Sequence, residues 1–136
     1  MTGAYGPTSG TVERESRRLM EPLMSFVLSD ELQRLRAEDH WQNGDRNSRT
    51  LAKAIDFRVL LSVLRDGAVL QEGDGDARVS IQLLDGRAVV ELDHAETQLG
   101  AGEMAVVDAG QPWTLRALAD CAVLLTLAWP REKARV

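Results

Sequence analysis

The side chains best suited to acid–base or nucleophilic chemistry in this sequence are two histidines and one cysteine. His40 and His94 are the only histidines, and either imidazole could exchange a proton near neutral pH. A catalytic histidine needs a neighbouring group that orients it, and the surrounding residues form no recognisable pattern of that kind. Cys121 begins an apolar run that ends at Ala128, which is typical of a small buried side chain. We therefore expect two surface histidines, a buried cysteine and no catalytic residues.

A run of acidic and glycine residues, Glu72-Gly-Asp-Gly-Asp76, is the second feature that could do chemistry, because closely spaced carboxylates can bind calcium. The run lacks the closing glutamate at the required distance and the rest of the ligand pattern of a calcium-binding loop. Glycine with acidic residues is also the ordinary composition of a surface turn. We therefore interpret the run as a turn between strands and expect no calcium.

Length and composition describe one globular domain. With 136 residues, of which 44% are hydrophobic, the chain can bury a core of its own. The formal net charge of −5 argues against binding nucleic acid, which needs a basic surface. The single cysteine cannot form an internal disulfide, and no apolar run suits a membrane span or a signal sequence. We expect a cytoplasmic protein that binds neither nucleic acid nor membranes.

The elements that would position these groups are a short helix and then many short strands. Asp30 and Gln33 have the spacing of a capping box, which predicts a helix over residues 30–39. Short β-prone runs follow, separated by turn residues such as Asp85-Gly86, the strongest hairpin signal in the chain. The runs span residues 49–54, 57–65, 68–72, 78–84, 87–92, 96–99, 104–108, 113–118 and 121–129. This spacing predicts an all-β sandwich or barrel.

Composition also predicts the limits of the domain. Residues 1–28 begin with Gly, Pro, Ser and Thr and contain little to bury, so we expect a partly disordered N-terminal tail. Residues 29–130 hold the predicted helix and all predicted strands, and they form the single domain. Residues 131–136 follow Pro130 and are mostly charged, which indicates a solvated C-terminal tail.

The glycine spacing within residues 49–129 resembles that of the cupin superfamily. The first cupin motif is a glycine, five residues, His-x-His, three or four residues, a glutamate, six residues and a glycine, and it fits when anchored on Gly67 and Gly86. The second motif is a glycine, five residues, Pro-x-Gly, two residues, a histidine, three residues and an asparagine, and it fits on Gly102 and Gly110. The resemblance implies a double-stranded β-helix, the cupin jelly-roll barrel, with a short N-terminal helix added.

The metal-binding positions of these motifs hold no metal ligands. The two histidine positions of the first motif fall on Gly73 and Gly75, and its glutamate position falls on Val79. The histidine position of the second motif falls on Trp113. In metal-binding cupins three histidines and a glutamate converge on one ion, whereas none of these four residues has a side chain that can donate an electron pair to it. The resemblance therefore implies a cupin without a metal, and we expect no other cofactor.

The motif alignment also predicts which side chains face the barrel interior. If Val79 points inward, strand alternation sends Ile81 and Leu83 inward as well, and Leu115 follows Trp113. These five residues form the predicted lumen. Two interpretations stay open: Trp113 plugs the barrel as part of the core, or it forms the wall of a pocket for a small apolar or aromatic ligand. We favour the plug, because aromatic side chains bury large areas and dominate cores.

The resemblance covers enzymes as well as ligand-sensing domains, so the fold alone does not choose a function. An apolar interior favours a metal-free, non-catalytic protein that binds a small molecule or another protein in a sensing or regulatory role. The alternative is a metal-independent sugar epimerase, isomerase or lyase, which would need a general acid or base in the lumen. A structural or assembly module is a third possibility. The predicted strand over 57–65 is apolar on nearly both faces, which predicts a homodimer formed by strand exchange or sheet packing.

Overall fold

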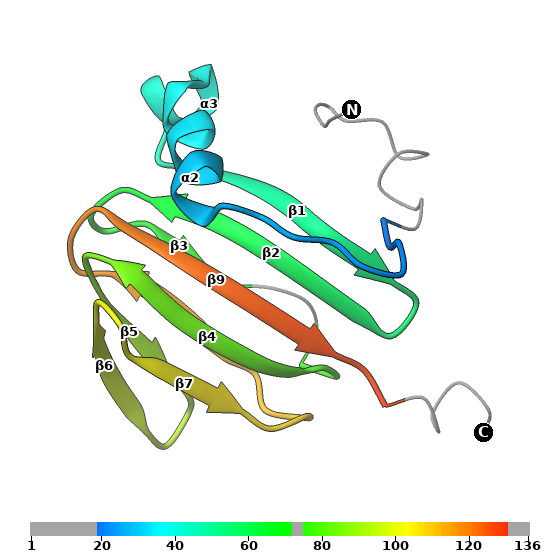
Figure 1. Ribbon diagram of the computed structural model, residues 1–136. Coiled ribbons are helices and arrows are strands. Elements are labelled where there is room, and N and C mark those ends of the chain that lie inside the picture. Colours follow the sequence, from blue (N-terminus) through cyan, green and yellow to red (C-terminus); the bar gives the residue numbers. More distant parts are fainter. Residues whose placement is uncertain (1–18, 72–74, 131–136) are drawn as a thin grey trace.

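The computed structural model describes residues 19–71 and 75–130 as two antiparallel β-sheets with a helical region on one side (Figure 1). The five-stranded sheet has the order β1-β2-β9-β4-β7, and the four-stranded sheet has the order β3-β8-β5-β6. All nine predicted strands are present. Their bounds are β1 Arg46–Ala54, β2 Phe57–Leu64, β3 Val69–Leu70, β4 Arg78–Asp85, β5 Arg87–Glu91, β6 Glu96–Gly100, β7 Met104–Val107, β8 Thr114–Ala117 and β9 Cys121–Ala128.

The alternation of side chains along β4 shows why this segment forms a strand between two different environments. Val79, Ile81 and Leu83 are buried, whereas Ser80 and Gln82 are half-buried. Successive side chains of a strand point to opposite faces, so the first set packs between the sheets and the second set lies on the outer face of the five-stranded sheet. The same cluster between the sheets includes Leu60, Leu64, Leu115, Val123 and Leu125 from other strands. This cluster is the inner core of the domain.

The predicted Asp85-Gly86 turn links β4 of one sheet to β5 of the other. Gly86 has φ +88°, a conformation that residues with a side chain rarely adopt. A Cβ at this position would also overlap the carbonyl oxygen of Asp120 and come within 2.7 Å of the Cβ of Cys121. Glycine is therefore required here twice, once by the backbone angle and once by the close approach of the loop before β9.

The N-terminal helix begins earlier than predicted. Helix α2 spans Leu28–Ala37, and a separate turn, α3, spans Asp39–Gln42. The predicted capping box is wrong: the N-cap residue is Val27, no side chain caps it, and Asp30 lies within the first helical turn. Carboxylates in the first turn still stabilise a helix through its dipole, which gives Asp30 a different local role from the one that its spacing indicated.

Helix α2 packs on the outer face of the five-stranded sheet, over β1 and β2. A second hydrophobic cluster joins the helix to the sheet, and its buried members are Leu35, Trp41, Leu51, Leu61, Val63 and Ala122. The odd-numbered Leu61 and Val63 of β2 thus pack against the helical region, while the even-numbered Leu60 and Leu64 pack in the inner core. This division explains why the strand over 57–65 is apolar on both faces.

Two polar contacts fix the end of the helical region against the sheet. The buried Asn47 donates from Nδ2 to the carbonyl oxygen of Leu35 at 2.9 Å and to Glu38 Oε1 at 2.8 Å. The guanidinium of Arg65 lies 3.7 Å from the centre of the Trp41 ring and donates to the Trp41 carbonyl at 2.9 Å. The Leu35 carbonyl, at the carboxyl end of α2, also accepts a hydrogen bond from the backbone N–H of Glu38 at 3.4 Å, so Asn47 adds a second and shorter one.

The residues directly before α2 form an extended arm over 19–27. Its first residue, Leu19, exchanges two backbone hydrogen bonds with Lys53 of β1, at 2.8 and 3.0 Å. Residues 19–27, which the predicted tail included, are joined to the sheet edge at Leu19, and Leu28 already belongs to the helix. Residues 1–18 and 131–136, the rest of the predicted tails, lie outside the described part. Among the described residues, neither helix has the length and apolar character needed to cross a membrane.

Candidate functional site

The five residues of the predicted lumen lie together in the inner core. Val79, Ile81, Leu83, Trp113 and Leu115 belong to one buried cluster, and the exposed fraction of Trp113 is 4%. Trp113 stands just before β8 and packs between the two sheets. This burial agrees with the interpretation in which Trp113 fills the barrel as part of the core. A ligand pocket formed by these five residues stays a prediction.

The glycine spacing that anchored both motifs has a conformational cause. The four anchor residues have φ between +85° and +88°, and they are Gly67, Gly86, Gly102 and Gly110. Positive φ is readily adopted by glycine and costs other residues free energy. The two motifs therefore mark turns in this structure, whatever the residues between them do.

The positions of the cupin metal ligands do not fit a metal in this chain. Gly73 lies outside the described residues. Gly75 has φ +90° and sits against the backbone of Gln111 and Pro112, so the fold uses it as a turn. Val79 and Trp113 are buried among apolar side chains. Valine and tryptophan side chains offer no ligand atom for a metal.

The rest of the described chain adds no donor cluster. Within residues 19–71 and 75–130, no three histidine, cysteine, aspartate or glutamate side chains lie close enough to hold a metal ion. Of the acidic run Glu72–Asp76, residues 72–74 lie outside the described part. The calcium interpretation of that run is thus neither supported nor tested here.

The three residues with acid–base or nucleophilic potential lie on three different parts of the fold. His40 is exposed in α3, and His94 is exposed in the turn between β5 and β6. Cys121 is buried at the start of β9, as predicted. Burial, together with the nearby charges of Asp120 and Asp85, raises the pKa of its thiol to about 11. A thiol with that pKa is almost wholly protonated near neutral pH and is a poor nucleophile.

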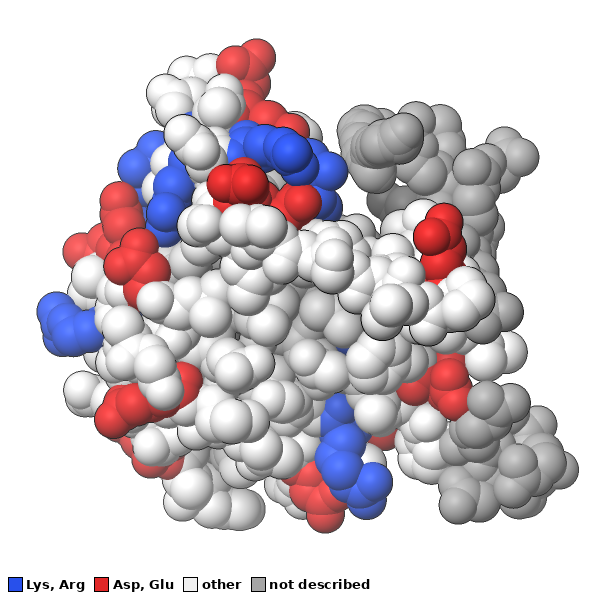
Figure 2. Space-filling view, viewed as in Figure 1, with Lys and Arg blue, Asp and Glu red and all other residues white. Residues whose placement is uncertain are grey.

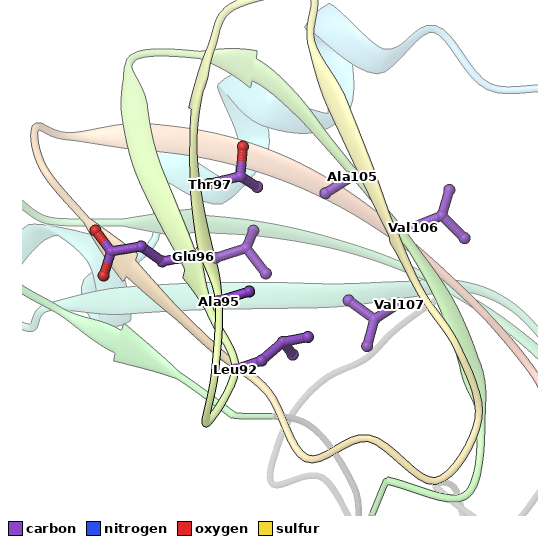
Figure 3. A pocket seen from close by; sticks show the side chains of 8 residues that line it. Leu92, Ala95, Glu96, Thr97, Ala105, Val106 and Val107 are labelled. Carbon is purple, nitrogen blue, oxygen red and sulfur yellow. The ribbon is translucent and has the colours of Figure 1, made fainter.

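A small hollow opens between the edges of the two sheets, where β6 and β7 end them (Figure 3). Its volume is about 130 Å³, and its lining consists of Val90, Leu92, Ala95, Glu96, Thr97, Ala105, Val106 and Val107. Figure 3 shows Leu92, Ala95 and Thr97 pointing toward it from one side and Ala105 and Val107 from the other, with Glu96 and Val106 directed away. Val90 and Val107 also belong to the inner core, so the hollow leads directly to that core.

None of the residues that line the hollow was singled out from the sequence. The available signal was weak: Ala95, Thr97 and Ala105 are small side chains in strands or turns, and small side chains leave space. The decisive information is the strand order, which makes β6 and β7 the edges of different sheets and brings them next to each other. That order depends on pairing between distant parts of the chain, and local patterns do not contain it.

Comparisons with known proteins agree with this architecture. Residues 58–135 match the family model described as the AraC-binding-like domain. The sequence has no match among curated proteins. A conserved protein of unknown function from Streptococcus pyogenes has a similar solved structure, with 21% identity, a TM-score of 0.64, and coverage of 84% of this chain and 96% of that chain.

Two further solved structures have the same fold at low identity. A cupin superfamily protein from Desulfitobacterium hafniense is 19% identical, with a TM-score of 0.59 over 62% of this chain and 78% of that one. A salicylate 1,2-dioxygenase variant from Pseudoaminobacter salicylatoxidans is 15% identical, with a TM-score of 0.70 over 92% of this chain but 40% of that one. The predicted jelly-roll fold with a short N-terminal helix is confirmed. At these identities the likeness concerns the fold alone.

Proposed function

This chain belongs to the AraC-binding-like domain family, a cupin-type fold, and from that premise we propose that it is a metal-free, non-catalytic domain that binds a small apolar molecule in a sensing or regulatory role. The observation that carries the proposal is the chemistry of the inner core. Val79 and Trp113 occupy ligand positions of the cupin motifs and are 1% and 4% exposed. Both side chains are apolar where the motifs of metal-binding cupins have a ligand, which supports a domain without a metal.

The inner core also offers little to acid–base chemistry. Its members are apolar side chains, Trp113 and the buried, protonated thiol of Cys121. The buried hydroxyl of Ser62 lies 2.7 Å from the hydroxyl of Ser48 and is satisfied by that hydrogen bond. A metal-independent epimerase, isomerase or lyase needs a positioned acid or base near the substrate, and the described inner core contains no carboxylate or imidazole. Binding is therefore better supported than catalysis.

The hollow between β6 and β7 is the site that we assign to the ligand. Its volume of about 130 Å³ is close to that of an engineered apolar cavity, roughly 150 Å³, that accepts benzene. Six of the eight residues that line it are valine, leucine or alanine, four of these six belong to the inner core or pack against it, and Thr97 supplies one hydroxyl. We therefore propose a small aromatic or aliphatic ligand, with at most one group that forms a hydrogen bond.

Nuclear magnetic resonance titration with toluene and benzyl alcohol tests the site. We expect saturable shifts of amide signals from residues 95–97 and 105–107, which line the hollow. Replacing Ala105 with leucine fills the space and should weaken binding by about tenfold or more. Ala37→Leu adds the same volume at an exposed helical position and is the matched control. Shifts that saturate elsewhere, or an Ala105→Leu variant that binds normally, would contradict the assignment.

Elemental analysis of the purified protein independently tests the proposal that the domain binds no metal ion. We expect far less than one iron, manganese, nickel or zinc ion per chain, because two of the motif positions hold a buried valine and a buried tryptophan. Chelator should then leave the unfolding transition unchanged. About one ion per chain, with loss of folding on its removal, would overturn this proposal.

A further inference from the structure

β7 is a short strand at the edge of the five-stranded sheet, and it forms one wall of the hollow. Its hydrogen-bonded neighbour in the strand order is β4, to which it is joined by four residue pairs that end at Val79↔Val107. On one side Ala105 and Val107 point toward the hollow. On the other side Met104 is 50% exposed and Val106 is 66% exposed. β7 is therefore less tightly packed than the central strand β9, most of whose residues are buried.

A glycine with positive φ lies beyond each end of β7. Gly102 has φ +87° and Gly110 has φ +85°. No described atom lies within 4 Å of the position that a Cβ would occupy at either glycine. Because glycine adopts many backbone conformations at low cost, the chain can rotate at both positions without a clash. Residues at the ends of an element that absorb such rotations act as hinges.

The end of β7 that follows the turn from β6 is tied to the inner core. The N–H of Gly102 donates to the carbonyl oxygen of Leu83 at 2.8 Å, and the N–H of Leu83 donates to the carbonyl oxygen of Glu103 at 2.9 Å. Glu103 Oε1 also accepts a hydrogen bond from the N–H of Gly100 at 2.7 Å. Leu83 is fully buried in the inner core, so this end of the strand is held in place.

The opposite end of β7 is tied at the surface. Arg78 Nε donates to Asp108 Oδ1 at 2.7 Å, which joins the start of β4 to the residue after Val107. The two side chains are 63% and 71% exposed, and exposed ion pairs contribute little to stability. Beyond the strand, the N–H of Gly110 donates to the carbonyl oxygen of Gly75. β7 itself contains no charged residue, and Figure 2 shows uncharged residues over the middle of this side of the molecule, with charged residues toward its margin.

We propose that β7 is a hinged wall of the hollow, which pivots at the Gly102 turn and moves away from β4 at its Val107 end to admit a ligand. The Arg78–Asp108 ion pair holds the closed position. This inference rests on the proposed ligand site and adds how that site opens. The closed hollow of about 130 Å³ suits a molecule near the size of benzene, so a longer ligand requires the wall to move outward.

Amide hydrogen exchange tests the movement without a ligand. The carbonyl of Glu103 bonds to β4, so strand alternation directs the amides of Ala105 and Val107 toward β4 as well. We expect these two amides to exchange at least about tenfold faster than the amide of Leu125 in β9, through local opening of β7. Equal protection of the two strands would mean that β7 opens only when the whole domain unfolds, and it would overturn the proposal.

A disulfide that holds β7 on β4 tests the effect on binding. Ser80 lies directly opposite Val106, so Ser80→Cys/Val106→Cys places two thiols within disulfide reach. The oxidised variant should bind n-butylbenzene at least about tenfold more weakly than the same variant reduced with dithiothreitol. Val59→Cys/Thr126→Cys joins β2 to β9 in the same way, away from the hollow, and is the matched control. The native Cys121 is buried with a pKa of about 11, so it should not interfere.

Removing the charge of Asp108 tests the role of the ion pair. Asp108→Asn keeps the Oδ1 atom that accepts a hydrogen bond from the N–H of Ala109 but removes the charge that faces Arg78. We expect n-butylbenzene to dissociate about two- to fivefold faster, because an exposed ion pair stabilises the closed wall only modestly. Asp45→Asn, which disrupts the exposed pair with Arg46 at the start of β1, is the matched control. Equal rates for the two variants would contradict this role.

Toluene separates a failure of the hinge from a failure of the site. It is one methyl group larger than benzene, so it should bind the oxidised and reduced forms of the Ser80→Cys/Val106→Cys variant alike. If toluene gives no saturable shifts at the hollow in any form, the proposed ligand site is wrong and the hinge has no function. If n-butylbenzene binds both forms equally, the site stands and the hinged wall is overturned.

Discussion

The two faces of β4 carry side chains of similar size but are used differently. On the inner face, Val79, Ile81 and Leu83 are at most 1% exposed, since the second sheet closes over them. On the outer face, Ser80 and Gln82 are half-buried and polar. The same backbone thus presents a buried apolar face to the second sheet and a half-buried polar face on the outside. We conclude that the inner face supplies most of the stability.

The inner face also holds the residues at which we propose that this chain departs from metal-binding cupins. Val79 lies on β4 at a motif position for a ligand, and here it is one of several aliphatic side chains around Trp113. An apolar residue at such a position stabilises the fold through its burial. A metal-binding side chain at the same position would instead lose its hydration, and only a bound metal would offset that cost. Substitutions on the two faces should therefore differ sharply in their effect on unfolding.

Removing the Trp113 ring should produce the largest effect. Trp113→Ala leaves a void between the sheets, so we expect the free energy of unfolding to fall by about 3–5 kcal/mol. Urea titration monitored by circular dichroism measures the change. Trp129→Ala is the matched control, because the Trp129 ring is half-buried at the edge of the same cluster and should cost less. A mild loss for Trp113→Ala, together with a saturable response to toluene, would show that Trp113 lines a pocket.

A pair of substitutions on adjacent residues of β4 sharpens the comparison. Ile81→Ala should lower the free energy of unfolding by about 2–5 kcal/mol, because the removed atoms are fully buried in the inner core. Gln82→Ala, one residue along the strand, should change it by about 0.5 kcal/mol or less. Both variants are measured by urea unfolding at one protein concentration, since association would add to stability. Equal losses would mean that the outer face of β4 is packed as tightly as its inner face.

The smallest effect is expected on the outer face of the four-stranded sheet. There Arg116 Nη2 lies 2.8 Å from Glu91 Oε2, and the hydrogen bond to Arg116 lowers the pKa of the Glu91 carboxyl below its ordinary value of 4.5. Because the folded state favours the charged carboxylate, the stabilisation is complete above pH 4.5 and disappears as the pH falls through the lowered folded pKa. Exposed pairs of this kind contribute little.

Thermal unfolding of Glu91→Gln beside the unmodified protein checks the sign of this effect. At pH 7 the variant should melt slightly lower, and the difference should shrink toward zero in acid. Thr114→Val removes a weaker neighbour of the same carboxylate, whose Oγ1 lies 3.4 Å away, and serves as a control with the ion pair intact. A difference that grows as the pH falls would contradict the lowered pKa.

Much of the fold could be predicted because the signals are local. All nine strands were expected, and most of their bounds agree to within one or two residues. The start of β1 was placed three residues late, since Asn47 is polar and its burial depends on partners in α2 and in Glu38. The capping box failed for a related reason: Leu28, at the start of α2, packs on the second hydrophobic cluster, and this tertiary contact outweighs the local preference of Asp30.

The candidate site divides in the same way. The proposal of a metal-free domain follows from the sequence alone, because valine and tryptophan at positions 79 and 113 offer no metal ligand in any packing. The hollow could not be predicted from the sequence, because it forms only where the edge strands β6 and β7 of the two sheets come together. Each of these strands is placed by pairing with partners elsewhere in the chain. The uncharged row of Val106, Ser80, Thr126 and Val59 on the outer sheet face likewise depends on four strands aligning in one register.

Local patterns were therefore sufficient to predict the strands, the alternation of their side chains and the turns at Gly67, Gly86, Gly102 and Gly110. These properties follow from the geometry of a few neighbouring residues, which is the range over which alternation and positive φ act. Which faces are covered, where the sheets part and which apolar side chains stay exposed became visible in the folded structure alone. Those outcomes depend on contacts between residues far apart in the chain, whose pairing no local pattern specifies.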